Sequence, residues 1–391
     1  MKTLLSLDRL RETFFERAAN YDLTDRFPHE NFADLAEAGL HAATLPESDG
    51  GLSCGFEETS RLLAEIAAGC PSTALCLAMH YYTLAGLSKF RDNGMLVRVF
   101  DDIRNNGEYM TSFNQPNVML QLKREQTQNS TRIAIRKLED GYLINGVKPY
   151  VSGCERFKYF PIYGNQEDSE TKLGITALMV TREDAGVRIE KAWQSTAMRG
   201  TLSHHVRLDN VFVPRERLIG EEGTGVEDTN ELTLWSRLAI SSVYQGIAKA
   251  AVDYILNAVK HKKDSYSQIS LAFMPGVQFT LAELLIQLET ASSQLLAFAR
   301  QADEESRQRN FSDELFQKSL ITKYYVTHTA NETVYKAMQI EGMNALTRGQ
   351  TLERLYRDVR AATFHQPGSD LLKELLAKKS LGLITLRNRW C

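Results

Sequence analysis

The spacing of apolar residues along the first part of the chain is helical. Residues 32–45 (FADLAEAGLHAATL) and 57–69 (EETSRLLAEIAAG) carry apolar side chains three and four positions apart, as amphipathic helices do. Residues 71–90 are apolar at nearly every position, which predicts a buried helix that begins at Pro71 or Ser72. We therefore expect residues 1–108 to form a helical domain.

The pattern changes after residue 108. Residues 131–151 alternate in short runs on either side of an Asp-Gly pair, as the two strands of a β-hairpin do. Strand-like runs continue at 174–183, 185–193 and 203–214, and the sequence GEEGTG at 220–225 predicts a turn. It lacks the Lys-Ser/Thr ending of a phosphate-binding loop. Residues 109–222 are therefore expected to form a β domain.

Long amphipathic segments return after residue 223. They cover residues 235–260, 278–308 and 313–339, and they predict a helical bundle over residues 223–391. The predicted fold class is thus α+β, with elements in the order all-α, all-β, all-α.

Composition narrows the class of protein. Hydrophobic residues make up 43% of the chain and charged residues 24%, as in ordinary globular proteins. A net charge of −3 without a basic stripe argues against nucleic acid or an anionic membrane as a partner. Asp8 and Arg9 interrupt the apolar start, and no apolar run is long enough to span a bilayer. The five cysteines show no CxxC spacing. Together these features predict a cytoplasmic protein.

Several histidines are candidates for chemistry. His204 and His205 are adjacent in a predicted strand, so they point to opposite faces, and we predict no metal site. His80 interrupts an apolar helix, either as a hydrogen-bonded core residue or as a group that lines a cavity. His365 has the same two interpretations. It lies just before Pro367, where a helix is expected to end, and could project into a cleft.

The predicted hairpin ends in the sequence NGVKPYVSG, at residues 145–153. By itself this is a strand with a glycine break. Its exposed backbone groups could also dock a flat heteroaromatic ring, with the Ser152 hydroxyl as one more hydrogen-bonding group.

Four motifs resemble those of the acyl-CoA dehydrogenase superfamily, in the same order. They are LPESDGG at 45–51, EDGYLINGVKPYVSG at 139–153, MRGTLSHHVRLDNVFVP at 198–214 and LERLYRDVRA at 352–361. The resemblance covers nearly the whole chain. It implies a helical domain, a β domain and a four-helix bundle, with a flavin between the last two. It also implies a homotetramer or homodimer, because in this superfamily a neighbouring subunit holds part of the flavin's diphosphate and adenine.

The resemblance also implies residues that contact the cofactor. Tyr150, Val151 and Ser152 fall where the superfamily flanks the flavin ring, with Ser152 near its N5. The diphosphate and adenine positions correspond to Lys263, Tyr266, Gln278, Gln339 and Gly342.

Three segments depart from the superfamily pattern. FNQPNVML stands where dehydrogenases have a strand that covers flavin and thioester, and it keeps only Pro116 of that pattern. Lys263 replaces an arginine, and GMNA replaces a glycine-rich adenine loop. A lysine holds a diphosphate as a point charge rather than as a fork. FAD is the expected flavin, with FMN as the alternative.

The largest departure concerns the catalytic base. Acyl-CoA dehydrogenases remove an α-proton with a glutamate. Counted from Arg357-Asp358, that position is Gln366, and a rarer position in the superfamily corresponds to Ser236. Glu341 or another carboxylate would have to fold into the site to replace the base.

A branch of the superfamily uses reduced flavin and oxygen instead, and its members tend to carry histidines that His365 and His80 resemble. Histidine suits such chemistry as a hydrogen-bond donor or proton source near neutral pH. We therefore predict a flavin monooxygenase that acts on a small organic substrate, with His365, His80 and Ser152 as catalytic residues and a flavin reductase as the implied partner. The alternatives are an acyl-CoA dehydrogenase with a displaced base and a non-catalytic oligomeric scaffold.

Overall fold

The first part of the chain is helical. The computed structural model describes residues 2–90, 92–116, 131–167, 169–171, 173–308 and 310–386. Five helices come first: α1 (Lys2–Thr24), α2 (His29–Glu37), α3 (Phe56–Gly69), α4 (Pro71–Leu87) and α5 (Gly94–Asn106). Helix α4 begins with Pro71 at its first position, where a missing backbone N–H leaves no hydrogen bond unmade. Asn93 caps α5 by accepting hydrogen bonds from Met95 N and Leu96 N.

A mixed seven-stranded sheet follows. Its strands are β1 (Ile133–Lys137), β2 (Gly141–Val151), β3 (Tyr159–Gln166), β4 (Ile175–Thr181), β5 (Val187–Glu190), β6 (His204–Pro214) and β7 (Leu218–Ile219). They lie in the order β5-β6-β2-β1-β3-β4-β7. Strands β1 and β2 form the predicted hairpin, with Ile135 opposite Ile144 and a turn closed by Leu138 N and Gly141 O.

The last part of the chain is helical again. It comprises α7 (Gly225–Asp228), α8 (Leu232–His261), α9 (Pro275–Arg307), α10 (Asp313–Glu341), α11 (Thr351–Arg360) and α12 (Ser369–Ser380). This part also contains the short 3-10 helices η6 (Leu271–Phe273), η7 (Gly342–Leu346) and η8 (Ala361–Phe364), whereas the 3-10 helix η4 (Arg199–Thr201) lies between β5 and β6. The order helices, sheet, helices confirms the predicted fold class.

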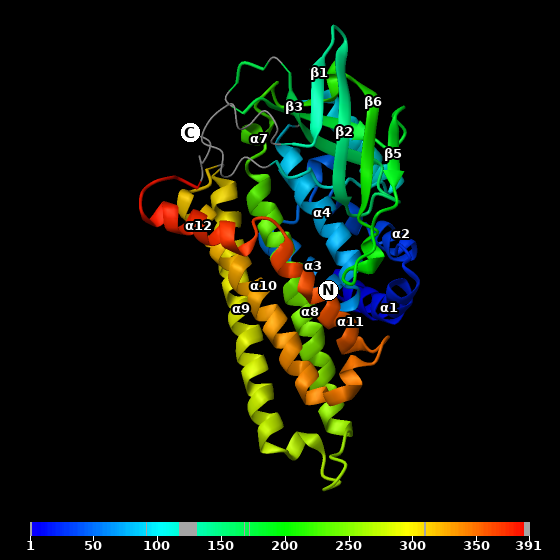
Figure 1. The fold of residues 1–391 in the computed structure, drawn as a ribbon, viewed down its shortest axis with the longest axis vertical. Helices are drawn as coiled ribbons and strands as arrows, with labels where there is room; N and C mark the ends of the chain where they lie inside the picture. The colour runs from blue at the N-terminus through cyan, green and yellow to red at the C-terminus, as the bar shows by residue number, and fades with distance from the viewer. Residues whose placement is uncertain are drawn as a thin grey trace.

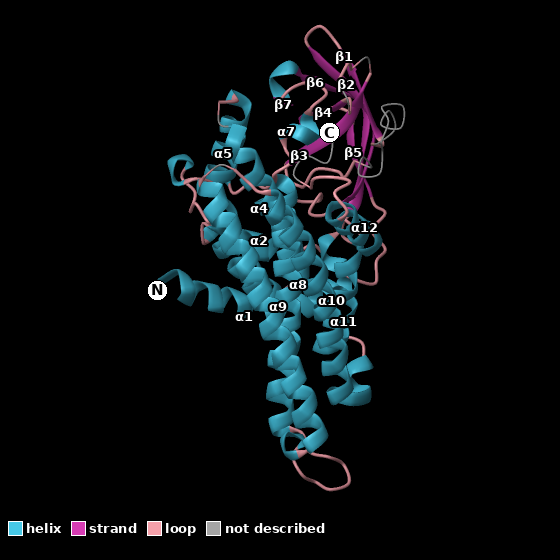
Figure 2. Ribbon diagram, turned by 90° about the vertical axis from the view of Figure 1, so that its left-hand side faces the viewer, coloured by secondary structure: helices cyan, strands magenta, loops and turns pink. Residues whose placement is uncertain are grey.

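The sheet and the long helices occupy opposite ends of the molecule. Figure 1 shows the strands at one end, with α8, α9 and α10 extending away from them, and α1 to α4 beside the bundle. The turned view in Figure 2 shows the same separation of strands from helices. Helix α8 is buried on most sides because it packs against α3, α4, α9 and α10. None of the described helices is long and apolar enough to cross a membrane.

Candidate functional site

The end of strand β2 presents an aromatic ring and a hydroxyl. The pairing of β2 with β6 is irregular between Lys148 and Val151, and Tyr150 there has a positive φ of 55°. This conformation turns the Tyr150 side chain outward, where it is 68% exposed beside the edges of Trp193 and His205. Val151 is buried, and Ser152 lies next to it with its Oγ 2.8 Å from Ser203 Oγ.

His365 is held by two residues of the bundle. Its Nε2 lies 2.7 Å from the hydroxyl of Tyr244 in α8. Lys323 in α10 donates hydrogen bonds from Nζ to the carbonyl oxygens of His365 (2.8 Å) and Pro367 (3.0 Å). Burial, assisted by the charge of Lys323, lowers the pKa of His365 to about 4. With this pKa the imidazole is neutral at pH 7, whereas the sequence suggested a group that titrates near neutrality.

The positions of the superfamily's base carry no carboxylate. Gln366 is exposed, and its Oε1 accepts a hydrogen bond from Gly368 N. Ser236 in α8 donates a hydrogen bond to Thr233 O. Ser236 also borders a cavity of about 70 Å³, and none of the described residues that line it is charged. The lining consists of Tyr82, Phe113, Asn114, Gln115, Pro116, Tyr163, Val226, Thr229, Asn230, Leu232, Thr233 and Ser236.

Glu341 does not replace the missing base. It lies at the last residue of α10, where it forms an ion pair with Lys262. Lys323, which contacts the His365 backbone, precedes Glu341 by 18 residues in the same helix. At 1.5 Å per residue, this corresponds to about 27 Å along the helix axis. The hypothesis that Glu341 folds into the site is therefore wrong.

His80 lies in the protein core. Its side chain is fully buried, with Nε2 2.7 Å from His41 O and Nδ1 accepting a hydrogen bond from Met110 N at 3.0 Å. Burial lowers its pKa to about 3. Both ring nitrogens are thus occupied by backbone groups. Of the two interpretations of His80, this geometry matches the hydrogen-bonded core histidine rather than a group that lines a cavity.

The predicted diphosphate and adenine contacts lie far from Tyr150 within one chain. All are exposed, and they occur on the loop after α8, at the start of α9, at the end of α10 and at the start of η7. This is the end of the bundle that points away from the sheet (Figure 1). The residues are Lys263, Tyr266, Gln278, Gln339 and Gly342. One chain therefore presents two separate groups of predicted cofactor residues.

Part of the departing segment FNQPNVML lies outside the described residues, at 117–120. The described part begins with Phe113, whose ring stacks on Tyr163 at a centroid distance of 4.2 Å. Asn114 fixes this arrangement, because its Oδ1 accepts from Tyr163 N and its Nδ2 donates to Tyr163 O.

Sequence reasoning missed Tyr244, Lys323 and the hydroxyl of Ser203. Tyr244 and Lys323 belong to long helices, and only the packing of those helices brings them to His365. Ser203 could have been found, since it occupies the serine position of the superfamily motif that residues 198–214 resemble. Among the described residues, no group of three or more His, Cys, Asp or Glu side chains could hold a metal ion.

Comparison with known proteins identifies relatives along most of the chain. Models of the acyl-CoA dehydrogenase N-terminal, middle and C-terminal domains match residues 8–90, 124–211 and 238–369. The putative acyl-CoA dehydrogenase YdbM of Bacillus subtilis is 27% identical over 387 residues, which cover 96% of this chain and 95% of that protein. An acryloyl-CoA reductase (NADH) of Anaerotignum propionicum is 23% identical, with 93% and 89% covered.

Solved structures share the fold. FMN-bound TdsC from Paenibacillus sp. A11-2 superposes with a TM-score of 0.87 at 20% identity, covering 98% of both chains. Butyryl-CoA dehydrogenase from Megasphaera elsdenii has a TM-score of 0.85 at 17% identity, covering 97% of this chain and 98% of that one. At these identities the likeness shows the fold alone. Together, the three domain models and the relatives show that this chain belongs to the acyl-CoA dehydrogenase superfamily.

Proposed function

We propose that this protein is a flavin-dependent oxidoreductase that uses reduced flavin and oxygen to oxygenate a small organic substrate. The observation that carries the proposal is the absence of a carboxylate at both base positions, which are occupied by Gln366 and Ser236. Removal of a weakly acidic α-proton needs such a base within hydrogen-bond reach. Oxygenation by reduced flavin does not need this base.

The end of β2 fits a flavin ring. A flavin has a flat aromatic ring system with a polar edge, and Tyr150 and Ser152 offer an exposed aromatic ring and a hydroxyl at one strand end. When bound there, the flavin would supply the electron transfer to oxygen. The chain's own residues would hold the ring, exclude water and donate hydrogen bonds.

The pair of His365 and Tyr244 supplies neutral hydrogen-bonding groups. A neutral imidazole carries one N–H and one acceptor nitrogen, and the Tyr244 hydroxyl can pair with either at Nε2. If Tyr244 donates, the proton of His365 resides on Nδ1 and can be donated elsewhere. Such a donor suits a reaction in which oxygen gains negative charge. Lys323 fixes the backbone on both sides of Gln366.

The separated cofactor residues support a homo-oligomer. If Lys263, Tyr266 and Gln339 bind the diphosphate and adenine of FAD, they must act on the flavin of a neighbouring copy, since they lie at the other end of the bundle. FMN has no adenine and would not need these contacts. The identity of the flavin released from the purified protein therefore tests both FAD and the neighbouring-subunit contact. A separate flavin reductase would supply the reduced flavin.

The second candidate is α,β-dehydrogenation of an acyl-CoA. The similarity to YdbM favours it. That protein is described as a putative acyl-CoA dehydrogenase, and it resembles this chain over nearly its whole length. This reaction would require a carboxylate other than Glu341 to reach the site.

The first test follows the reaction of reduced flavin with oxygen on the purified protein. We expect a transient absorbance distinct from both oxidised and reduced flavin, and a lifetime at least about tenfold shorter in His365→Ala, which lacks the donor. His328→Ala is the matched control, because His328 is exposed and contacts Ser369. Direct reoxidation without a transient in the wild type would contradict the proposal.

Two further outcomes separate the alternatives. Anaerobic mixing with a panel of acyl-CoA thioesters should leave the flavin oxidised, and bleaching by any chain length would establish dehydrogenation instead. A purified protein that is colourless and takes up neither FAD nor FMN would favour the non-catalytic scaffold.

A further inference from the structure

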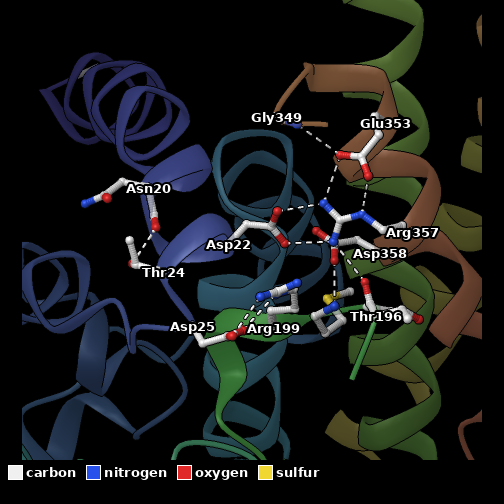
Figure 3. Close-up of polar contacts among 12 residues, drawn as sticks. Asn20, Asp22, Thr24, Asp25, Thr196, Arg199, Gly349, Glu353, Arg357 and Asp358 are labelled. Atoms are coloured by element: carbon white, nitrogen blue, oxygen red, sulfur yellow. Dashed lines mark hydrogen bonds and ion pairs between the residues drawn. The ribbon is translucent and has the colours of Figure 1, made fainter. Parts of the chain in front are cut away.

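The Arg357-Asp358 pair joins the three parts of the fold. Figure 3 shows Arg357 between Asp22 of α1, Glu353 of α11 and Thr196 of the segment before η4. Its guanidinium reaches both carboxylate oxygens of Asp22, at 2.9 and 2.6 Å. Asp358 is only 3% exposed, and its Oδ1 accepts a hydrogen bond from Met198 N at 2.6 Å.

Asp358 holds a loop in an unfavourable conformation. This loop, residues 198–203, has two non-glycine residues in the left-handed region, Met198 at φ 52° and Leu202 at φ 41°. Such conformations persist where the surroundings fix them. Hydrogen bonds fix the loop at Met198. The Met198 N–H donates to Asp358, and the Met198 carbonyl oxygen accepts hydrogen bonds from Trp193 Nε1 and Thr201 Oγ1.

The same loop holds the turn that contains Ser152. Thr201 O accepts a hydrogen bond from Gly153 N at 3.1 Å, and Leu202 O accepts from Cys154 Sγ at 3.5 Å. The hydroxyls of Ser203 and Ser152 lie 2.8 Å apart. Gly153 has a φ of 77°, and a side chain there would collide with Phe157, so the turn has little room to rearrange.

The hydroxyls form a relay with a defined direction. Met198 O can only accept, so the Thr201 hydroxyl donates its single proton to this oxygen, at an O–O distance of 2.8 Å. Thr201 Oγ1 and Ser203 Oγ lie 2.8 Å apart, and Ser203 must be the donor there. Ser203 then has no proton left, so Ser152 donates to it. Ser152 Oγ therefore keeps only lone pairs for any other partner.

We infer that this relay makes Ser152 an acceptor that favours the reduced state of a flavin, with Asp358 as the positioning residue that holds the loop. Reduction converts the flavin N5 from an acceptor into an N–H donor, and hydrogen bonds to the ring nitrogens tune a flavin's electronics. An acceptor at Ser152 pairs with the N–H of the reduced ring and offers nothing to the oxidised N5. This inference rests on the proposed function, which puts the flavin beside Ser152.

The first experiment measures the midpoint potential of the flavin bound to the intact protein. In Ser203→Ala, the Ser152 hydroxyl loses its acceptor, so it can donate a hydrogen bond to the oxidised ring. We expect the preference for reduced over oxidised flavin to fall about tenfold, which lowers the potential of a two-electron couple by about 30 mV. Thr201→Val should have the same effect by removing the start of the relay. Ser195→Ala is the control, because Ser195 lies in the segment before the loop and its hydroxyl accepts a hydrogen bond from Ala197 N, outside the relay.

A double mutant tests whether the effect passes through Ser152. In a Ser152→Ala background, Ser203→Ala should leave the potential unchanged, whereas a general loosening of the site would shift it again. If the wild type binds flavin but neither Ser203→Ala nor Thr201→Val shifts its potential, the relay inference is wrong and the proposed function is untouched. If the wild type binds no flavin, the proposed function and this inference both fail.

The role of Asp358 is tested without flavin. Trypsin cleaves after arginine, and Arg199 lies inside the loop, held by Asp25. Asp358→Ala should speed cleavage after Arg199 at least about tenfold, whereas Asp358→Asn should stay close to the wild type because its amide oxygen still accepts from Met198 N. Asp22→Asn is the control, because it weakens the ion pair between Asp22 and Arg357 and leaves the hydrogen bond between Asp358 and Met198 N in place. Equal cleavage in the Ala and Asn variants, or cleavage throughout the chain rather than at Arg199, would overturn this role.

Discussion

At the scale of single residues, the environment of a histidine decides its chemistry. His80 and His365 looked alike in the sequence, since each interrupts or ends a helical segment. Within the structure His80 has both ring nitrogens on backbone groups, whereas His365 faces the hydroxyl of Tyr244. Lys323 donates its hydrogen bonds to two backbone carbonyl oxygens, those of His365 and Pro367, and burial lowers the pKa of Lys323 to about 8. Two basic groups are thus adjacent, a buried Lys323 and a partly buried His365.

Replacing Lys323 should change the acidity of His365. In Lys323→Met the neighbouring positive charge is removed, so the pKa of His365 should rise from about 4 while staying below its ordinary 6.5, because burial is the larger cause. We expect the imidazole to bind its proton about tenfold more tightly. An NMR titration of the histidine ring protons measures this, with Lys249→Met as the control, because Lys249 is partly exposed and pairs with Asp253.

The sign of the pH effect follows from the lowered pKa. Between pH 6.5 and about 4, His365 binds a proton in the unfolded chain but not in the folded chain. The free energy of unfolding therefore falls as the pH falls through this window. Lys323→Met should narrow the window. An unchanged pKa in the variant would show that Lys323 does not act on the imidazole.

At the scale of elements, a buried lysine ties strand β2 to its neighbours. Lys148 is 2% exposed and donates hydrogen bonds to Thr111 Oγ1 (2.9 Å), Ser112 O (2.5 Å) and Pro161 O (2.9 Å). It thereby joins β2 to β3 and to the segment that follows Met110. These three acceptors are all neutral, and burial lowers the pKa of Lys148 to about 7.

Lys148 should make stability rise with pH. Between about pH 7 and its ordinary 10.5, the unfolded chain holds a proton that the folded chain has lost, so the free energy of unfolding increases over this window. The contribution is on the order of 5 kcal/mol at most. Lys148→Met should remove this slope, as measured by urea unfolding at several pH values. Lys137→Met, with its partly exposed ion pair to Glu222, is the control and should keep the slope.

At the scale of the whole molecule, apolar side chains gather at the end of the bundle away from the sheet. Phe273, Phe279 and Ile286 of η6 and α9 are 73%, 73% and 66% exposed. Met343 of η7 is 81% exposed. Exposed apolar side chains in such numbers are typical of surfaces that another chain covers. Their position beside the predicted adenine contacts agrees with the proposed homo-oligomer.

A charge on this surface should weaken self-association. Ile286→Asp would bury an unpaired carboxylate if a second copy packs there, so the dissociation constant should rise at least about tenfold. Sedimentation velocity over a range of concentrations measures this. Leu381→Asp is the control, since Leu381 is 73% exposed but follows α12 at a different part of the surface. A wild-type monomer, or equal effects of both variants, would contradict the proposed interface.

The sequence predicted the order of elements better than the composition of the site. Periodicities of three to four and of two residues come from local geometry, so the helical and strand segments and the Asp-Gly hairpin could be located without the fold. The spacing from Arg357-Asp358 located His365 and Gln366. The contact between Tyr244 and His365 could not be predicted, because it joins residues 121 positions apart.

The sequence by itself determined the three-part plan, the superfamily and the lack of a glutamate at the usual base positions, since these depend on residue identity and local spacing. Tertiary structure alone decided that Glu341 lies too far away, that His80 is a core residue and that His365 is neutral. It also decided the direction of the hydroxyl relay from Met198 to Ser152. These properties depend on burial and on hydrogen bonds between distant segments, and local sequence does not specify either.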